Sequence, residues 1–177
     1  MRQKYATFLD YLRKEYKGPY SATDIIIRYT QHFPWNDYEL GCKSGIILIE
    51  RKNYPHGLAL PGGMAERITY VENAIKEAKE ETGLDVVIDE PYHRPFSVLS
   101  DINQDPRAHI SSICYTGVGY GVLRAGDDAK KADLYTFGEV TELLGQPERW
   151  AFIHHQEIIR LYVEDVDFRM KGERGIL

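Results

Sequence analysis

Three glutamates that lie close together in the sequence are the residues best suited to chemistry. Glu77, Glu80 and Glu81 stand at positions i, i+3 and i+4, so in a helix their carboxylates share one face. Like charges at this spacing destabilise an isolated helix, whereas a bound divalent cation would offset them. Carboxylate oxygens suit Mg²⁺, with Mn²⁺ as the alternative ion. The pattern indicates a candidate site for a divalent cation, and its plain alternative is a solvated acidic face.

Signals around the glutamates predict the helix that carries them. Thr69 followed by Glu72 fits a capping box, so a helix is expected over residues 70–82. An apolar stripe at helical spacing is formed by Val71, Ala74, Ile75, Ala78 and Thr82. Gly83 then supplies a left-handed stop. Upstream, the glycine turn at residues 61–63 is backbone that can approach a ligand or a metal closely.

The stretch from Gly63 to Leu84 reads GMAERITYVENAIKEAKEETGL. It resembles the Nudix box, which runs Gly, five residues, Glu, seven residues, Arg-Glu-apolar-any-Glu-Glu-any-Gly-apolar. The slots at the end of the box hold Glu77, Glu80, Glu81, Gly83 and Leu84. The resemblance implies an α/β fold, a Nudix-like α/β/α sandwich with a mixed β-sheet. It also implies that the three glutamates bind the cations that bridge a pyrophosphate, and that Glu80 or Glu81 activates the water.

The first part of the box departs from the family pattern. Lys76 occupies the arginine slot, and Thr69 occupies the first glutamate slot when the count starts at Gly63, where the interval is one residue short. Counting from Gly62 restores the length but places Ile68 in that slot. Because the missing pair supports the catalytic helix in the family, their joint loss suggests a rebuilt brace. Lysine lacks the planar fork of arginine, so a weaker brace would lower activity.

Other segments resemble the ADP-ribose pyrophosphatase branch of the family. They are residues 24–27, 45–53, 58–63, 105–109 and 125–129. The resemblance implies metal-dependent hydrolysis of a nucleoside diphosphate derivative, with ADP-ribose giving AMP and ribose 5-phosphate. The alternatives are a damaged-nucleoside-triphosphate pyrophosphohydrolase, a nucleotide-binding sensor with a weakened box, and an ordinary soluble domain that carries an acidic helix.

Residues outside the helix are candidates for the metal shell or for substrate binding. Asp128 aligns with an acidic position that completes the metal shell in related hydrolases, although aspartate beside glycine often serves a turn. Arg107 is a candidate phosphate ligand, and its alternative is an ion pair with Asp105 or Asp101. The predicted substrate-binding set is completed by Arg51, Gly62, Gly63 and His109.

Histidines and aromatic residues elsewhere carry a weaker signal. His154 and His155 lack metal-like spacing with the glutamates, so a structural role is expected for both. Phe33, Trp35 and Phe96 are candidates for stacking on an adenine ring, but isolated aromatic residues more often belong to the core.

The composition favours one compact, soluble domain. The chain has 177 residues, 43% of them hydrophobic, and a net charge of −5. An acidic protein lacks the basic face that a nucleic-acid backbone requires, and no apolar run reaches the roughly 20 residues of a membrane span. Cys42 and Cys114 have no ligand spacing and are expected to be reduced core thiols. A cytoplasmic enzyme without nucleic-acid or membrane partners is expected, and the oligomeric state, a homodimer included, stays open.

Residues 1–20 are predicted to form a helical extension and residues 21–177 the hydrolase domain. The helix of the extension, at residues 3–16, has an apolar face expected to pack on the domain's own core, with a partner contact as the alternative. Strands are expected at 22–29, 45–51, 58–61, 86–88, 96–99, 110–122 and 134–137, and further helices at 140–144 and 154–164. A proline between two aromatic residues at 31–35 predicts a loop.

Overall fold

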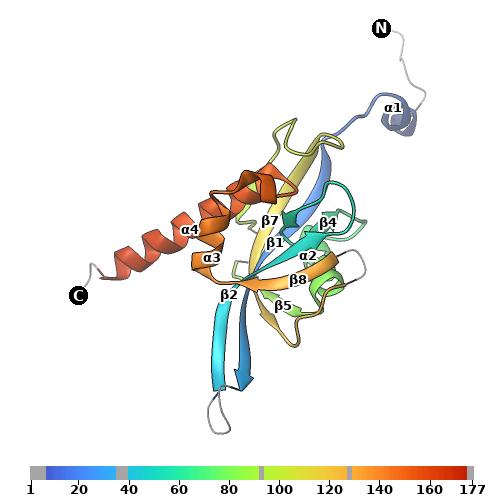
Figure 1. Cartoon of the computed structure of the whole chain (residues 1–177). Helices are drawn as coiled ribbons and strands as arrows, with labels where there is room; N and C mark the ends of the chain where they lie inside the picture. Colours follow the sequence, from blue (N-terminus) through green and yellow to red (C-terminus); the bar gives the residue numbers. More distant parts are fainter. Residues whose placement is uncertain (1–6, 35–39, 92–93, 127–128, 175–177) are drawn as a thin grey trace.

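The computed structural model of the chain describes residues 7–34, 40–91, 94–126 and 129–174 (Figure 1). In chain order the elements are α1 (Phe8–Lys14), β1 (Tyr20–Pro34), β2 (Leu40–Arg51), β3 (Leu58–Ala59), β4 (Gly62–Met64), α2 (Tyr70–Thr82), β5 (Asp85–Ile88), β6 (Ser97–Leu99), β7 (Ile110–Tyr120), β8 (Ala129–Tyr135), α3 (Phe137–Leu143), η1 (Pro147–Arg149) and α4 (Ile153–Arg174). The last helix therefore continues well beyond its predicted end at residue 164. No helix among the described residues is long and apolar enough to cross a membrane.

A mixed sheet forms the centre of the molecule. Its main path has the order β3-β2-β1-β7-β5, while β4, β6 and β8 pair with β1, β7 and β2. β1 and β7 run parallel, with Ala22 opposite Ser112, and the other pairs are antiparallel. The three isoleucines at 25–27 in β1 are fully buried, because this part of the sheet is covered on both faces.

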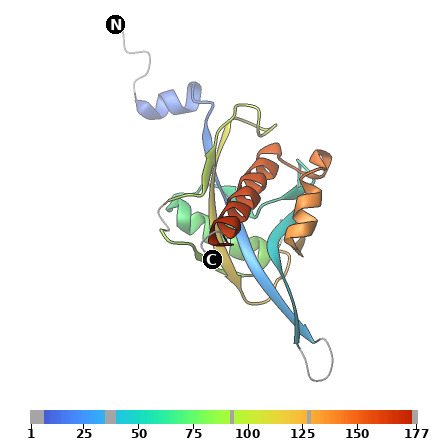
Figure 2. The same cartoon turned by 90° about the vertical axis from the view of Figure 1, so that its left-hand side faces the viewer.

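The two faces of the sheet pack against different helices. One core cluster joins the strands to α3 and α4 and contains Ile26, Ile46, Leu48, Val140, Ile158 and Tyr162. The other joins the strands to α2 and contains Ile25, Ile27, Ile47, Ala74, Ala78 and Leu84. Successive side chains of a strand point to opposite faces, so neighbouring isoleucines enter different clusters. The α/β/α sandwich with a mixed sheet expected from the sequence is confirmed (Figures 1 and 2).

Both ends of α2 follow the signals in the sequence. The Thr69 hydroxyl accepts a hydrogen bond from the Glu72 N–H at 3.3 Å, and the Glu72 carboxylate accepts one from the Thr69 N–H at 3.0 Å. These two bonds complete the predicted capping box. At the other end, Gly83 adopts a left-handed φ of 71° and donates its N–H to the Lys79 carbonyl. With both ends and the buried face fixed, the direction of each glutamate on α2 is also fixed.

β1 and β2 continue past the sheet as a two-stranded ribbon, at the bottom of Figure 1. Its register pairs Tyr29 with Gly45 and Pro34 with Leu40, so the loop predicted for 31–35 is wrong as far as Pro34. Proline is tolerated there because each strand of this part of the ribbon is an edge strand in the described structure. Cys42 is exposed on the ribbon, whereas Cys114 is buried, so only one of the two thiols is a core thiol.

α1 lies apart from the sheet (Figures 1 and 2). It is shorter than the helix predicted for 3–16, the first residues of which lie outside the described part of the chain. Phe8 and Leu9 are 72% and 61% exposed. The expectation that this apolar face packs on the core is therefore wrong for these two residues, because the helix precedes β1 at the margin of the sheet and extends away from it.

Candidate functional site

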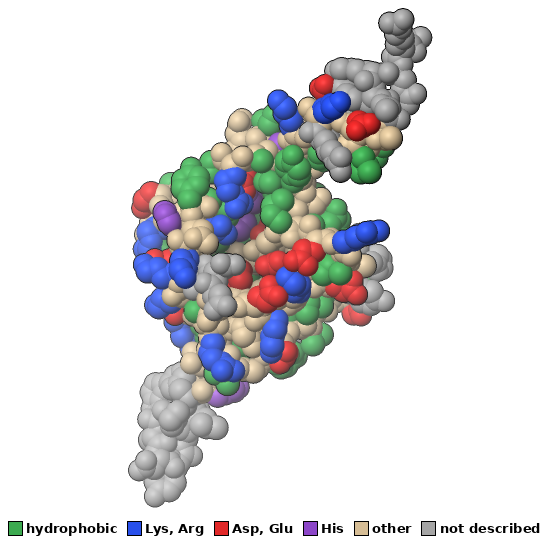
Figure 3. All heavy atoms as spheres, turned by 90° about the vertical axis from the view of Figure 1, so that its right-hand side faces the viewer, with side chains coloured by type: hydrophobic (Ala, Val, Ile, Leu, Met, Phe, Trp, Pro, Cys, Tyr) green, Lys and Arg blue, Asp and Glu red, His purple; other side chains and the backbone are tan. Residues whose placement is uncertain are grey.

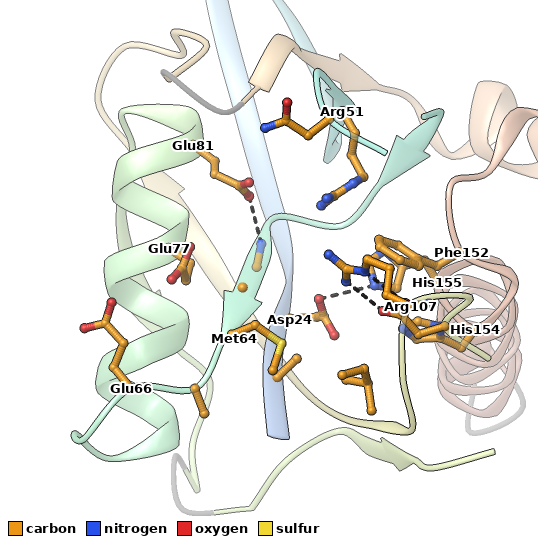
Figure 4. Close-up of a pocket in the computed structure, with 17 residues that line it drawn as sticks. Asp24, Arg51, Met64, Glu66, Glu77, Glu81, Arg107, Phe152, His154 and His155 are labelled. Atoms are coloured by element: carbon orange, nitrogen blue, oxygen red, sulfur yellow. Dashed lines mark hydrogen bonds and ion pairs between the residues drawn. The ribbon is translucent and has the colours of Figure 1, made fainter. Parts of the chain in front are cut away.

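A cavity of about 390 Å³ opens where α2, the turn between β3 and β4, the loop before β7 and the start of α4 converge (Figure 4). The residues selected from the sequence that line it are Arg51, Gly62, Gly63, Glu77, Glu81 and Arg107. Sequence reasoning did not select the other charged or ring-bearing residues of the lining, which are Asp24, Glu66, Asp105, Phe152, His154 and His155. Acidic side chains also gather near the middle of the molecular face in Figure 3, with basic side chains among them.

Glu77 and Glu81 project from α2 into the cavity (Figure 4). Glu81 is 6% exposed, and its Oε2 accepts a hydrogen bond from the Gly62 N–H at 2.9 Å. Burial, together with the negative charges of Glu77 and Asp24, raises the pKa of Glu81 to about 8, although the Gly62 N–H and Arg51 oppose the rise. A divalent cation would favour the ionised form of this carboxyl. Two carboxylates facing one cavity are hard oxygen donors, so the residues present fit such a cation.

The glycine turn lies against both β1 and α2. At Gly62 an added Cβ would stand 2.3 Å from the Thr23 carbonyl oxygen and 2.6 Å from Asp24 Oδ1. At Gly63 it would stand 2.6 Å from the carboxyl carbon of Glu77. Gly62 has no room for a side chain because backbone of β1 lies against it, whereas a side chain at Gly63 would have to displace the Glu77 carboxylate. The turn therefore needs glycine to keep backbone this close to the carboxylates.

Glu80 occupies a different environment from the other two glutamates. Its Oε2 lies 3.0 Å from Lys76 Nζ, its side chain is 56% exposed, and it is not among the residues that line the cavity. Lys76 Nζ also lies 3.1 Å from Glu66 Oε1 and 3.8 Å from Glu77 Oε1. Glu66 thus supplies a carboxylate opposite Lys76, while Thr69 caps the helix. Lys76 therefore pairs with Glu66, which sequence reasoning missed, and whether this pair supports α2 as a rebuilt brace stays a prediction.

Asp24 and His155 form a buried pair that connects β1 with α4, and sequence reasoning did not assign either residue to the site. His155 Nδ1 accepts a hydrogen bond from the Leu60 N–H at 3.0 Å, so its proton resides on Nε2, which lies 3.2 Å from Asp24 Oδ1. Burial alone would raise the pKa of Asp24, but His155 and the Ser112 hydroxyl outweigh it and hold that pKa below its usual value. An aspartate within an isoleucine strand was the available signal, because a buried carboxylate requires partners.

His154 adjoins this pair. Its Nδ1 lies 3.2 Å from the Gln104 carbonyl, and burial lowers the pKa of His154 to about 4. Asp24, His154 and His155 each present one atom of metal-ligand type, and these atoms lie within 4.8 Å of one another. Both nitrogens of His155 are already engaged, and a cation on Nε2 would have to displace its proton. The donors present at His155 therefore do not fit a cation.

Two arginines form the wall opposite the glutamates (Figure 4). The guanidinium carbons of Arg51 and Arg107 lie 5.0 Å and 5.2 Å from the centroid of the Phe152 ring. Arg107 also donates two side-chain hydrogen bonds to Asp105, at 3.0 Å and 2.7 Å, so the ion pair considered from the sequence exists within the cavity lining. Burial and the neighbouring Arg107 lower the pKa of Arg51. The wall is well suited to a phosphate, which would relieve the repulsion between the two cations.

Other residues selected from the sequence lie elsewhere. His109, a predicted substrate ligand, is outside the cavity lining, and its Nε2 lies 3.2 Å from both the hydroxyl and the carbonyl of Ser100, at the entrance to β7. Phe96 makes an edge contact with Tyr162 in the core rather than a stacking surface, with ring centroids 5.7 Å apart. Asp128 and Trp35 lie outside the described residues.

Comparison with known proteins gives a family and a fold. The family model for the NUDIX domain matches residues 40–162. The ADP-ribose pyrophosphatase of Methanocaldococcus jannaschii is 39% identical over 122 residues, which cover 67% of this chain and 65% of that protein. The match therefore leaves about a third of that relative unmatched.

Two solved structures share the fold at low sequence identity. One is a bifunctional NMN adenylyltransferase/ADP ribose pyrophosphatase from Francisella tularensis in complex with AMP and a Mn ion, with a TM-score of 0.65, 20% identity, and coverage of 88% of this chain and 44% of that one. The other is the NUDIX domain of Shewanella oneidensis NrtR in complex with ADP ribose, with a TM-score of 0.62, 16% identity, and coverage of 90% and 99%.

Proposed function

The chain belongs to the NUDIX domain family, and from this premise we propose that it hydrolyses the pyrophosphate bond of a nucleoside diphosphate derivative. ADP-ribose is the proposed substrate, with AMP and ribose 5-phosphate as products. The observation that carries the proposal is one cavity in which the carboxylates Glu77 and Glu81 face the guanidinium groups Arg51 and Arg107. The 39% sequence identity with the ADP-ribose pyrophosphatase of Methanocaldococcus jannaschii supports the choice of substrate.

Glu77 and Glu81 are the proposed ligands of a divalent cation, Mg²⁺ or Mn²⁺, and Asp128 is a further predicted ligand. The cation supplies positive charge at the phosphate oxygens and helps to position the water. Glu81 is the preferred base, because of the two predicted bases it lines the cavity while Glu80 is paired with Lys76. Water attacks one phosphorus, the bridging P–O bond breaks, the water proton passes to the carboxylate, and the leaving phosphate takes the bond electrons.

The remaining lining residues are assigned to substrate binding. Arg51 and Arg107 hold the phosphates from the side opposite the glutamates, since a guanidinium offers paired donors to phosphate oxygens. Gly62 and Gly63 bring backbone close to Glu81 and Glu77, which leaves no side chain between these carboxylates and the cavity. His109 is not retained in this set, because its contacts are with Ser100.

Product analysis with a matched control tests the proposal. Purified protein with Mg²⁺ is incubated with ADP-ribose and, separately, with nucleoside triphosphates, and the products are separated by chromatography. AMP and ribose 5-phosphate are expected from the parent and from Glu142→Gln, an exposed glutamate on α3, but not from Glu81→Gln. Cleavage of a damaged nucleoside triphosphate without cleavage of ADP-ribose would transfer the assignment to that substrate class. Saturable ADP-ribose binding without turnover would indicate a sensor.

A further inference from the structure

One histidine ring connects three parts of the fold beside the catalytic glutamates. His155 lies in the first turn of α4 and is 3% exposed. Its Nδ1 accepts the N–H of Leu60, at 3.0 Å, in the segment between β3 and β4. Its Nε2 lies 3.2 Å from Asp24 Oδ1 in β1. A single side chain thus holds α4, the glycine turn and the central strand together.

The contacts continue from this ring to Glu81. The Pro61 carbonyl, next after Leu60, accepts the N–H of Ile25 at 2.9 Å, and Gly63 is the register partner of Thr23, so the turn is paired with β1 on both sides of Asp24. Gly62 then donates its N–H to Glu81 Oε2 at 2.9 Å, and its α-carbon lies so close to Asp24 that an added Cβ would be 2.6 Å from Oδ1.

Asp24 is also held from a third strand. Its Oδ2 accepts a hydrogen bond from the hydroxyl of Ser112 in β7. With Oδ1 against His155, both carboxylate oxygens have a fixed partner, which is the condition for keeping a buried carboxylate in one orientation. Gly62 therefore packs against a carboxylate, that of Asp24, whose orientation is fixed by His155 and Ser112.

We propose that His155 is a positioning residue for Glu81: through Leu60 and Asp24 it fixes the place of the Gly62 N–H, and through that hydrogen bond the orientation of the Glu81 carboxylate. This inference rests on the proposed function in one respect, the assignment of Glu81 and Glu77 as cation ligands. Groups that orient metal ligands commonly change metal affinity by roughly 10–100-fold when they are removed.

The two hydrogen bonds of the ring can be removed one at a time. Asparagine at position 155 places an oxygen near the position of Nδ1, so His155→Asn keeps an acceptor for Leu60 and loses the donor to Asp24. Glutamine places a nitrogen near the position of Nε2, so His155→Gln keeps the donor and loses the acceptor. Gln156→Leu is the matched control, because Gln156 is also buried in α4 but donates to Leu144, away from the cavity.

Mg²⁺ affinity by calorimetry and the amide resonance of Gly62 by NMR are the measurements. We expect His155→Gln to weaken Mg²⁺ binding by at least about 10-fold and to shift the Gly62 resonance, His155→Asn to do both to a smaller extent, and Gln156→Leu to do neither. The ring ¹⁵N shifts of His155 in the parent should report a proton on Nε2. Folded His155 variants with parental Mg²⁺ affinity and an unmoved Gly62 resonance would overturn the proposal.

Two further measurements keep the test decisive. If the His155 variants do not fold, Ser112→Ala loosens Asp24 from the other side, and an unchanged Gly62 resonance there would count against the proposal. If the parent binds no Mg²⁺, the proposed function fails, whereas the Gly62 resonance still reports whether His155 positions the turn. A ring ¹⁵N shift of His155 on addition of Zn²⁺ would identify the ring as a cation ligand and would also overturn the proposal.

Discussion

Replacing Gly63 with alanine should separate folding from function. The new Cβ would stand 2.6 Å from the carboxyl carbon and Oε2 of Glu77, whereas ordinary contact begins near 3.4 Å, so the carboxylate must retreat by roughly 0.8 Å. The end of a glutamate side chain can make this move, and we expect the free energy of unfolding to fall by less than about 1 kcal/mol. A misplacement of about 1 Å at a reacting centre can cost roughly 100-fold in rate.

The assay combines Mg²⁺ titration, kcat/KM for ADP-ribose and urea unfolding. Gly63→Ala is expected to lose most of its Mg²⁺ affinity and roughly 100-fold in kcat/KM while it unfolds almost as the parent does. Gly138→Ala is the control, since the nearest atom to its new Cβ is Thr136 Oγ1 at 4.0 Å, and a glycine-to-alanine change in α3 should stabilise by roughly 0.5–1 kcal/mol. Parental Mg²⁺ affinity and kcat/KM in Gly63→Ala would refute the assignment of Glu77.

Three other predictions follow from α2 and from the buried His154. Thr69→Ala removes the N-cap of α2 and should lower the free energy of unfolding by about 1 kcal/mol in a urea titration. Lys76→Arg keeps a cation beside Glu66 and Glu80 and should retain kcat. Lys76→Met removes the cation and should lower kcat with little change in Tm. Equal kcat values in the two variants would show that these ion pairs have no catalytic role. Burial lowers the pKa of His154 from 6.5 to about 4, so the unfolded chain binds the additional proton, and the free energy of unfolding should decrease as the pH falls from 6.5 towards 4. Urea titrations between pH 6.5 and 4 should show that the free energy of unfolding of His154→Gln depends less steeply on pH than that of the parent. Equal dependence on pH in the two proteins would contradict the reasoning.

Local signals in the sequence predicted the parts of the structure that depend on local contacts. The ends of α2 follow from Thr69, Glu72 and Gly83, because capping involves residues only a few positions apart. The placement of Glu77 and Glu81 towards a cavity follows from the same helix once its apolar stripe is buried.

Residue spacing could not predict contacts between segments that are far apart in the sequence. Asp24 meets His155 only because β1 and the start of α4 are adjacent in space. Phe152 meets Arg51 and Arg107 because the residue before α4 also lies near the end of β2 and the loop before β7. The family pattern also directed attention to position 69, whereas the carboxylate opposite Lys76 stands at Glu66. Periodicity identified an apolar face on α1 but could not show that the chain before β1 leads away from the sheet.

The ribbon formed by β1 and β2 carries a cysteine that can be labelled selectively. Cys42 is exposed on this ribbon, whereas burial raises the pKa of Cys114 well above its usual value, and the thiolate is the form that reacts with electrophiles. A maleimide dye or a nitroxide should therefore attach to the native chain at one position, without prior removal of the second cysteine. Because Cys42 lies outside the cavity lining, such a reporter would follow the surroundings of the ribbon while the glutamates and arginines remain unmodified.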